Sequence, residues 1–283
     1  MTETTPAGRI VAVTGGAQGI GREIARRLAE AGARVAIGDR DIRAAEATAQ
    51  ALPGQVHAFT LDVTDTGSFR RFLAEVTVLW GPLDVLVNNA GVMWVGAFDD
   101  EPETATERML AVNLHGVIRG VRLVAPLMRE RGRGHIVTIA SAASKLAPPG
   151  ESTYAATKHA VLGYLTGVRE ELRGSGVEIS VIMPGVVDTE LAIGTDSGAT
   201  SPLRPGDVAA AVVEVLRRPR FEVTLPASIG LLVRITALLP QSIRDQVLRR
   251  TVPNQVEATR DSNTRAGYEN RALTETTAPK ESW

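Results

Sequence analysis

The sequence contains no cysteine, no long apolar run and no large excess of either charge. Without cysteine, the chain cannot form disulfides, use a thiol nucleophile or bind a metal through sulfur. No stretch of 18 or more uncharged apolar residues occurs, so a membrane-spanning helix is not expected. The segment MTETTPAGR at the start also lacks the apolar core of a secretion signal. These absences predict a cytoplasmic protein.

Charge and composition exclude further classes of protein. The formal net charge is −1 at pH 7, which offers no basic surface to a nucleic-acid partner. The four histidines are scattered without metal-ligand spacing, so no metal site is predicted. Apolar residues make up 44% of the 283 residues and charged residues 22%, an ordinary globular composition that can bury a sizeable core.

Strand-like and helical patterns alternate along the first three quarters of the chain. The strand-like segments are 9–14, 33–38, 56–61, 83–87, 135–140 and 221–225, and the helical segments are 22–31, 42–51, 68–79, 103–131 and 207–216. Such alternation is typical of a parallel sheet with helices on both faces. We therefore expect an α/β fold, a Rossmann-type doubly wound parallel sheet, as a single domain over residues 1–225 with a C-terminal extension.

A glycine-rich turn lies between the first strand and the first helix. Gly15, Gly19 and Gly21 follow Thr14 in the spacing Thr-Gly-x-x-x-Gly-x-Gly. Glycine permits a tight turn and lets a phosphate approach the backbone, while the helix N-terminus adds free N–H groups and a positive dipole end. This context predicts binding of a dinucleotide pyrophosphate, with a plain strand-turn-helix as the alternative.

Asp39 ends the second strand, 18 residues after Gly21. An acidic residue at about this distance accepts hydrogen bonds from the adenosine ribose and repels a 2′-phosphate, so Asp39 favours NAD. Arg40 follows it directly and could attract that phosphate, which keeps NADP open, whereas Gln18 is not basic. Asp39 can also act as the N-cap of the helix over 42–51.

Ser141, Tyr154 and Lys158 form a second candidate constellation. Tyr154 and Lys158 are four residues apart, so on a helix they share one face and the ammonium can lie beside the phenol. A nearby cation favours the phenolate and lowers a tyrosine pKa, which would allow general acid or base catalysis. Ser141 can donate a hydrogen bond to a substrate oxygen on which charge develops.

Several polar residues coincide with the predicted ends of strands, where ligands bind in open α/β sheets. Together the motifs resemble those of the short-chain dehydrogenase/reductase family over about residues 9–225. The matching elements are the loop 14–21, Asp62, the run Asn88-Asn89-Ala90-Gly91, Asn113, Ser141, Tyr154, Lys158 and the run from Pro184 to Thr189. The resemblance implies NAD or NADP as cofactor and hydride transfer between the nicotinamide and a carbonyl/alcohol pair. It also implies a homodimer or homotetramer, assembled through helices near 105–131 and 152–175.

The resemblance further implies a role for each matched residue. Tyr154 is the general acid/base, Lys158 lowers its pKa and binds the nicotinamide ribose, and Ser141 orients the carbonyl oxygen. Asn113 holds a water that links Lys158 to solvent. Without the resemblance, Asn113 reads as a polar residue on a helix, and Thr189 as a helix N-cap. The expected cofactor-binding residues are Gly15, Gln18, Gly19, Ile20, Gly21, Asp39, Arg40, Asp62, Val63, Asn89, Ala90, Gly91, Tyr154, Lys158, Pro184, Gly185, Val187 and Thr189.

The substrate side is expected to be mainly apolar. Candidate substrate-contacting residues are Met93, Val95, Ser141, Ala143 and Leu191, which favour a small apolar alcohol or ketone. Lys145 and Glu151 are nearby polar exceptions. The substrate loop covers 186–205, and its stretch GTDSGATSPLRP over 194–205 predicts a mobile lid.

The residues beyond 225 have a different character. Residues 226–240 are strongly apolar and belong to an apolar and basic segment, 226–253, that carries several arginines. We expect 226–240 to pack between subunits or over the pocket, with contact to an anionic membrane surface as a less favoured alternative. Residues 254–283 are polar and mixed in charge, which predicts a flexible tail.

Two other functions compete with an NAD-dependent alcohol dehydrogenase or ketone reductase. One is an NADPH-dependent ketoacyl-type reductase, which Arg40 favours and Asp39 opposes. The other is a catalytically silent dinucleotide-sensing protein, because a fold alone does not establish chemistry. The complete set of Asn113, Ser141, Tyr154 and Lys158 argues against a sensor, which needs no proton relay.

Overall fold

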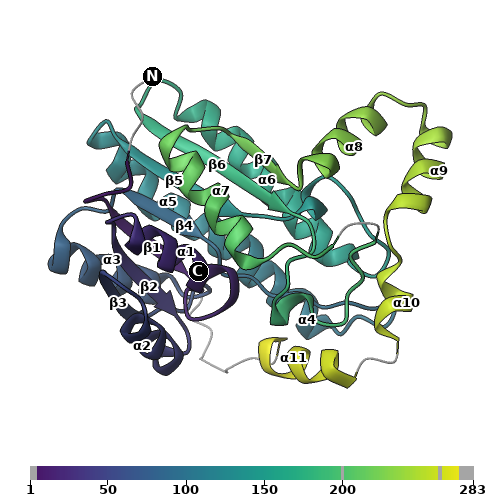
Figure 1. Cartoon of the computed structure of the whole chain (residues 1–283), viewed down its shortest axis with the longest axis horizontal. Coiled ribbons are helices and arrows are strands. Elements are labelled where there is room, and N and C mark those ends of the chain that lie inside the picture. Colours follow the sequence, from purple (N-terminus) through teal and green to yellow (C-terminus); the bar gives the residue numbers. More distant parts are fainter. Residues whose placement is uncertain (1–4, 199–200, 261–262, 274–283) are drawn as a thin grey trace.

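A computed structural model describes residues 5–198, 201–260 and 263–273 of the chain. Its centre is a seven-stranded sheet in the order β3-β2-β1-β4-β5-β6-β7, and every neighbouring pair is parallel (Figure 1). The strands are β1 (Ile10–Thr14), β2 (Arg34–Asp39), β3 (Gln55–Thr60), β4 (Val85–Asn88), β5 (Gly134–Ile139), β6 (Val177–Pro184) and β7 (Glu222–Leu225). The predicted doubly wound fold is confirmed, although β6 was not among the predicted strands.

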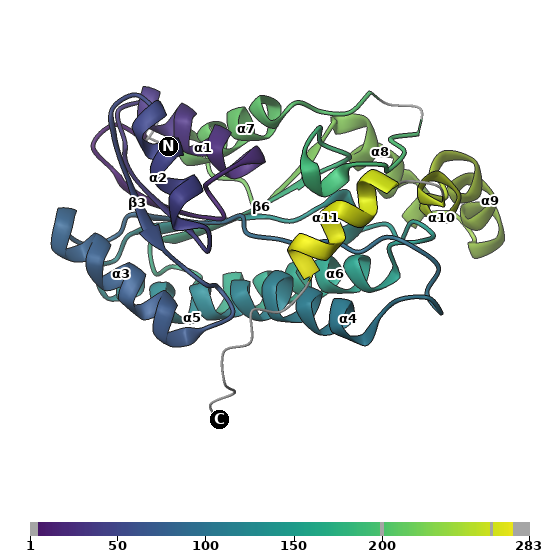
Figure 2. The same cartoon turned by 90° about the horizontal axis from the view of Figure 1, so that it is seen from below.

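Helices cover both faces of the sheet, as Figure 2 shows. One face carries α1 (Gly19–Glu30), α2 (Ile42–Ala51) and α7 (Pro205–Arg217). The other face carries α3 (Thr66–Trp80), α5 (Gly116–Glu130) and α6 (Ser152–Glu171), with α4 (Glu103–Met109) beyond the carboxyl ends of the strands. Because the sheet is buried on both sides, its central strands consist of continuous apolar runs.

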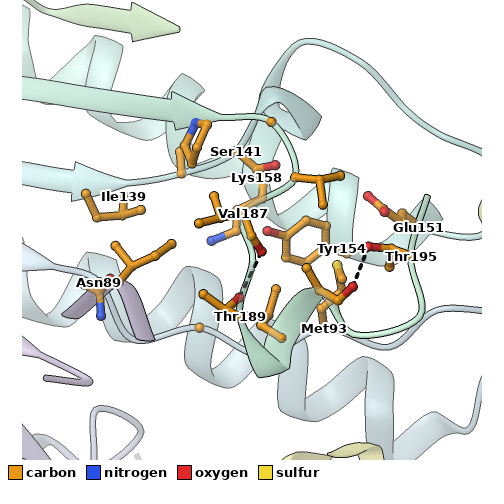
Figure 3. A pocket seen from close by; sticks show the side chains of 18 residues that line it. Asn89, Met93, Ile139, Ser141, Glu151, Tyr154, Lys158, Val187, Thr189 and Thr195 are labelled. Carbon is orange, nitrogen blue, oxygen red and sulfur yellow. Dashed lines mark hydrogen bonds between the residues drawn. The ribbon is translucent and has the colours of Figure 1, made fainter. Parts of the chain in front are cut away.

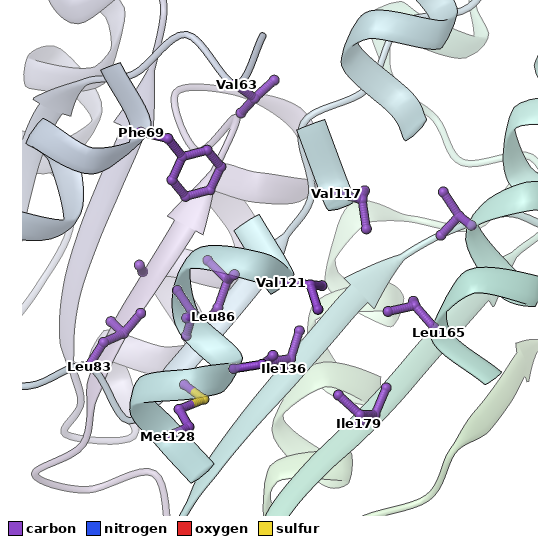
Figure 4. Packing of buried hydrophobic residues seen from close by; sticks show 14 of the residues in the cluster. Val63, Phe69, Leu83, Leu86, Val117, Val121, Met128, Ile136, Leu165 and Ile179 are labelled. Carbon is purple, nitrogen blue, oxygen red and sulfur yellow. The ribbon is translucent and has the colours of Figure 1, made fainter. Parts of the chain in front are cut away.

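The core on the α3, α5 and α6 side is built from branched aliphatic and aromatic side chains (Figure 4). Val121 and Met128 of α5 meet Ile136 of β5, while Phe69 of α3 fills the space beside Leu86 of β4. Fully burying one such side chain contributes about 1.5 to 3 kcal/mol. This packing holds the carboxyl ends of β1, β4, β5 and β6 in fixed positions, and those ends carry the candidate site.

The helical stretch Glu103–Glu130 is long and apolar enough, by length and composition alone, to cross a membrane. In the fold its apolar side chains have another role, because Val117, Val121 and Val124 are buried in the core. A π-helical turn, Leu110–His115, interrupts the stretch between α4 and α5. The turn carries Asn113, so the irregular backbone lies at a candidate functional residue.

The segment after β7 forms two helices, α8 (Ala227–Ala237) and α9 (Gln241–Thr251), which project from the sheet domain (Figure 1). Leu238 is 87% exposed, and Leu231 and Ile235 are also exposed in the single chain. None of residues 226–240 lines the pocket at the strand ends in the single chain, although Ile229 of α8 lies beside Gly185, which does line it. Packing between subunits and contact with a membrane surface stay predictions.

The predicted flexible tail is wrong for residues 255–259 and 263–273. These residues form α10 (Gln255–Thr259) and α11 (Asn263–Leu273), and α11 crosses the carboxyl side of the sheet near α4 (Figure 2). Gln255 is buried, and its side chain pairs with the backbone N–H and C=O of Asp196, both at 2.8 Å. The rest of the predicted tail, 274–283, lies outside the described residues.

Candidate active site

The glycine turn between β1 and α1 has the tight geometry expected of a phosphate-binding loop. Gly15 and Gly19 adopt positive φ angles of 64° and 54°, which side-chain-bearing residues rarely adopt. A Cβ on Gly21 would stand 2.1 Å from the carbonyl oxygen of Gly15, so the helix approaches the strand too closely for any side chain. The Asn89 amide fixes this turn by donating to the carbonyl oxygens of Thr14 at 3.0 Å and Gly15 at 2.9 Å.

A cleft of about 480 Å³ opens beside this turn, at the carboxyl ends of β1, β2 and β4. Most of the predicted cofactor-binding residues line it: Gly15, Gln18, Gly19, Ile20, Asp39, Arg40, Asp62, Val63, Asn89, Ala90, Gly91 and Thr189. Gly21 lies behind the wall, where its absent side chain permits the turn. The start of α1 turns its free N–H groups toward the cleft, which suits an anionic group. The residues therefore fit a dinucleotide, with its pyrophosphate at the α1 N-terminus.

Asp39 contacts the glycine turn directly. Its carboxylate accepts hydrogen bonds from the backbone N–H groups of Ala17 and Asp41, both at 3.1 Å. Burial raises the pKa of Asp39, while these backbone hydrogen bonds act to lower it. The expectation that Asp39 caps the next helix is wrong, because Asp41 is the N-cap of α2 and accepts from Ala44 N at 3.0 Å. Asp39 thus stands at the cleft wall with its carboxyl group beside the loop.

Tyr154, Lys158 and Ser141 converge on a second, smaller pocket of about 110 Å³ that adjoins the cleft. Tyr154 and Lys158 lie on one face of α6, and the Lys158 ammonium stands 5.4 Å from the centre of the Tyr154 ring. Ser141 lies just past the carboxyl end of β5. In Figure 3 the ring lies between Lys158 on one side and Glu151 and Thr195 on the other. The predicted common face is confirmed.

The pKa of Tyr154 differs from the prediction that a nearby cation lowers it. Burial raises the pKa of Tyr154 above its ordinary value, the charge of Glu151 raises it further, and the hydrogen bond with Ser141 lowers it. Burial also lowers the pKa of Lys158 to about 8. The physical reason is that both groups lie in a dry pocket, where loss of water disfavours each charged form. In the protein alone, the phenol is therefore held in its neutral, proton-donating form.

Asn113 is a positioning residue in this structure. Its amide donates to the Val92 carbonyl at 2.8 Å and to the Thr157 hydroxyl at 3.3 Å, and it accepts from Val92 N at 2.8 Å. A Cβ on Gly91 would stand 3.4 Å from Asn113 Oδ1 and 3.7 Å from Lys158 Nζ. Asn113 and Lys158 thus both lie beside Gly91. The water that the resemblance implies between them stays a prediction.

The last residue of β6 and the segment that follows it form the far wall of the smaller pocket. Pro184, Gly185, Val187 and Thr189 all line it, and all four are among the expected cofactor-binding residues. The Thr189 hydroxyl bonds the Val187 carbonyl at 3.3 Å and makes no capping bond, so the N-cap interpretation of its side chain is wrong. The end of the predicted lid is bonded to this wall, because Leu203 and Val187 form an isolated parallel β-bridge.

The predicted substrate residues divide into two groups. Met93, Ser141 and Leu191 line the smaller pocket. Val95 and Ala143 are not among the residues that line it, and they pack in a buried apolar cluster with Met93, Met109 and the aromatic ring of Tyr154. Their side chains are buried in that cluster. The sequence could not show this, because a pattern of apolar residues does not distinguish a packed wall from one that faces a pocket.

Sequence reasoning missed the contribution of α11. Arg265 is only 3% exposed, and its guanidinium donates to the carbonyl oxygens of Met93 and Leu191, both at 2.6 Å. The Tyr268 hydroxyl accepts from Met93 N at 3.3 Å, and Glu269 accepts from Val95 N at 3.2 Å. The helix therefore ties together two loops that wall the pocket. The sequence did carry one signal, because Arg265, Tyr268 and Ala272 have the spacing of residues on one face of a helix.

Comparisons with known proteins agree with this geometry. The sequence profile of the family described as short chain dehydrogenase matches residues 9–199. Dehydrogenase/reductase SDR family member 7B of Rattus norvegicus is 35% identical over 193 residues, which cover 65% of this chain and 59% of the rat protein. The probable oxidoreductase EphD of Mycobacterium tuberculosis is 33% identical over 267 residues, which cover 86% of this chain and 45% of that protein. The chain thus spans about half to three-fifths of the length of these two relatives.

Solved structures show the same overall fold. A short-chain dehydrogenase/reductase from Burkholderia phymatum, solved in complex with NAD, superposes with a TM-score of 0.77 at 26% identity, over 89% of this chain and 98% of its own. An alcohol dehydrogenase from Thermococcus sibiricus, solved with 5-hydroxy-NADP, gives a TM-score of 0.69 at 29% identity, over 77% of this chain and 95% of its own.

Proposed function

The chain belongs to the short-chain dehydrogenase family, and from this premise we propose that it transfers a hydride between NAD and a small, largely apolar secondary alcohol or ketone. The observation that carries the proposal is the convergence of Ser141, Tyr154 and Lys158 on one pocket that adjoins the dinucleotide-shaped cleft. A binding protein without chemistry would not need a buried proton donor at that junction.

A nicotinamide bound at the junction of cleft and pocket would supply or accept the hydride. Ser141 then donates a hydrogen bond to the substrate oxygen and holds it beside the phenol. In ketone reduction, the neutral Tyr154 gives its proton to that oxygen as negative charge develops there. In alcohol oxidation, the phenolate takes the hydroxyl proton.

Lys158 assists both directions through its charge. The ammonium stands 5.4 Å from the centre of the Tyr154 ring and favours the phenolate that remains after proton donation. Because burial lowers the pKa of Lys158 to about 8, the ammonium is the major form at neutral pH and loses its proton in mildly alkaline solution. Asn113 supports the arrangement by fixing Val92 and Thr157 around it.

The choice of NAD rests on Asp39, whose carboxylate at the cleft wall would repel a 2′-phosphate. Arg40 lines the same cleft and favours NADP, so the ketoacyl-type reductase using NADPH is the second candidate. The apolar substrate class is supported by Met93, Ile139 and Leu191 in the pocket wall.

The test is a panel of small secondary alcohols with NAD or NADP, and of the matching ketones with NADH or NADPH. Absorbance of the reduced nicotinamide reports each reaction. We expect turnover with NAD and apolar secondary alcohols. Tight dinucleotide binding with no turnover of any compound would instead support the silent sensing protein.

A further inference from the structure

Glu151 places a carboxyl group in the otherwise largely apolar wall of the smaller pocket. It stands immediately before α6 as the N-cap residue, but its side chain makes no capping hydrogen bond. Glu151 is 8% exposed and lines the pocket together with Tyr154 and Thr195. Figure 3 shows its carboxyl group beside Thr195, on the side of the Tyr154 ring remote from Lys158.

None of the described residues donates a hydrogen bond to this carboxyl group. The nearby Thr195 hydroxyl donates to the Ala192 carbonyl at 2.7 Å instead. Arg265 acts on Glu151 through its positive charge, and its guanidinium donates hydrogen bonds to Glu269 and to the carbonyl oxygens of Met93, Leu191 and Ile193. Because Glu151 lines the pocket and receives no hydrogen bond from these residues, its carboxyl group can accept one from a molecule that enters the pocket.

The protonation of Glu151 is balanced near neutrality. Burial raises its pKa to about 7, and the positive charge of Arg265 acts in the opposite direction. The other titratable groups around the pocket are Tyr154 and Lys158 on α6 and Tyr268 on α11. A ligand that donates a hydrogen bond to Glu151 stabilises the ionised carboxylate and supplies the partner that the protein lacks.

We propose that Glu151 is the specificity-determining residue of a second substrate subsite, which binds a hydrogen-bond donor, a hydroxyl or a protonated amine, remote from the reacting carbon. The inference rests on the proposed function, because Ser141 and Tyr154 fix the reacting oxygen at one end of the pocket. The body of the substrate contacts Met93 and Leu191, and the donor reaches Glu151. The substrate class is then a secondary alcohol or ketone with an apolar body and one additional donor group.

The probes are cyclohexanol, the 1,3- and 1,4-cyclohexanediols, and 3- and 4-aminocyclohexanol, each measured with NAD. The measured quantity is the preference, defined as kcat/KM for a donor-bearing compound divided by kcat/KM for cyclohexanol. We expect the wild-type protein to prefer at least one donor-bearing compound about tenfold or more. Glu151→Leu should reduce that preference by roughly ten- to a hundredfold, the value of a hydrogen bond to a charged group.

Further variants separate charge from shape. Glu151→Gln keeps the size and one acceptor oxygen, so it should keep part of a preference for a diol and lose a preference for an amine. Glu178→Gln is the matched control and should leave the preference unchanged. This exposed glutamate lies near the start of β6, whereas the pocket lies at the carboxyl ends of the strands. Between pH 6 and 8, both preferences should rise as Glu151 ionises, and the preference for an amine should rise more than that for a diol, because the amine also carries a positive charge.

Binding measured without turnover separates this inference from the proposed function. Each variant is first checked for unchanged NADH affinity, and its NADH complex is then titrated with the same alcohols in a calorimeter. Reduced nicotinamide cannot accept a hydride, so this titration reports binding alone. The subsite is refuted if the wild-type complex binds every donor-bearing compound no better than cyclohexanol, or if Glu151→Leu keeps the preference. Preferential binding through Glu151 without turnover of any panel compound would refute the proposed function and keep the subsite.

Discussion

Replacing Arg265 by alanine should release α11 from the pocket without unfolding the sheet domain. The variant loses the donations to the carbonyl oxygens of Met93 and Leu191, each at 2.6 Å, and the ion pair with Glu269 at 2.7 Å. Removing one partner of a buried ion pair costs about 3 to 5 kcal/mol. Because these contacts join α11 to two loops, the loss appears as local opening of the helix.

Amide hydrogen exchange over residues 263–273 measures this opening. A cost of about 3 kcal/mol raises the open population roughly a hundredfold, and the exchange rate should rise in proportion. Arg271→Ala is the control on the same helix, because Arg271 is 65% exposed and its ion pair with Glu190 lies at the surface. Such a pair contributes about 0 to 1 kcal/mol.

Arg265→Lys should fall between the wild type and the alanine variant. One ammonium cannot reproduce the planar fork with which arginine reaches several carbonyl oxygens at once. Because Met93 and Leu191 line the pocket, Arg265→Ala should also raise KM for the substrate. Equal exchange in the Arg265→Ala and Arg271→Ala variants would refute the idea that Arg265 anchors the helix.

Three more predictions follow from individual side chains. NAD should bind more tightly than NADP, and Asp39→Ala should narrow the difference in dissociation constant; equal wild-type affinities would contradict the assigned role. Burial lowers the pKa of His135 to about 3, below its unfolded value near 6.5, so the stability it contributes is present above pH 6.5 and is lost as the pH falls. Between pH 6.5 and 3 the free energy of unfolding of the wild-type protein falls, and His135→Gln should remove up to about 5 kcal/mol of that fall. Urea unfolding at pH 7 and pH 4 measures it, and an equal fall in the wild type and the variant would contradict this prediction. The double substitution Leu231→Asp and Leu238→Asp should shift the sedimentation coefficient toward that of the single chain. An unchanged oligomer would argue against packing of α8 between subunits. Binding of the wild-type protein, but not of the variant, to anionic vesicles would favour contact with a membrane surface.

The residues that line the candidate dinucleotide cleft were predictable because their requirements are local. The turn from Gly15 to Gly21 needs residues without Cβ, and the position of Asp39 follows from the length of one helix and one strand. The four-residue spacing of Tyr154 and Lys158 likewise gave their common face. These features depend on backbone geometry within short segments, which sequence patterns report directly.

The remaining features depend on tertiary contacts. An arginine such as Arg265 usually indicates an exposed helix face, and only the carbonyl oxygens of distant loops make its burial favourable. The neutral state of the phenol was missed for a similar reason, since the degree of desolvation around Tyr154 is not visible in the spacing of its neighbours. Glu151 was recognised only as a polar exception, because the absence of a donor is a property of the folded pocket.

The most direct test of the proposed function compares Tyr154→Phe with the wild-type protein in two measurements on the same preparations. The account predicts that kcat with the best alcohol of the panel falls about a hundred- to ten-thousandfold, the usual value of a general acid or base. The dissociation constant of NADH should stay nearly unchanged, because the phenylalanine keeps the ring that packs against Met93 and Ala155 and removes only the hydroxyl. Turnover within tenfold of the wild-type rate would contradict the central claim that Tyr154 transfers the proton.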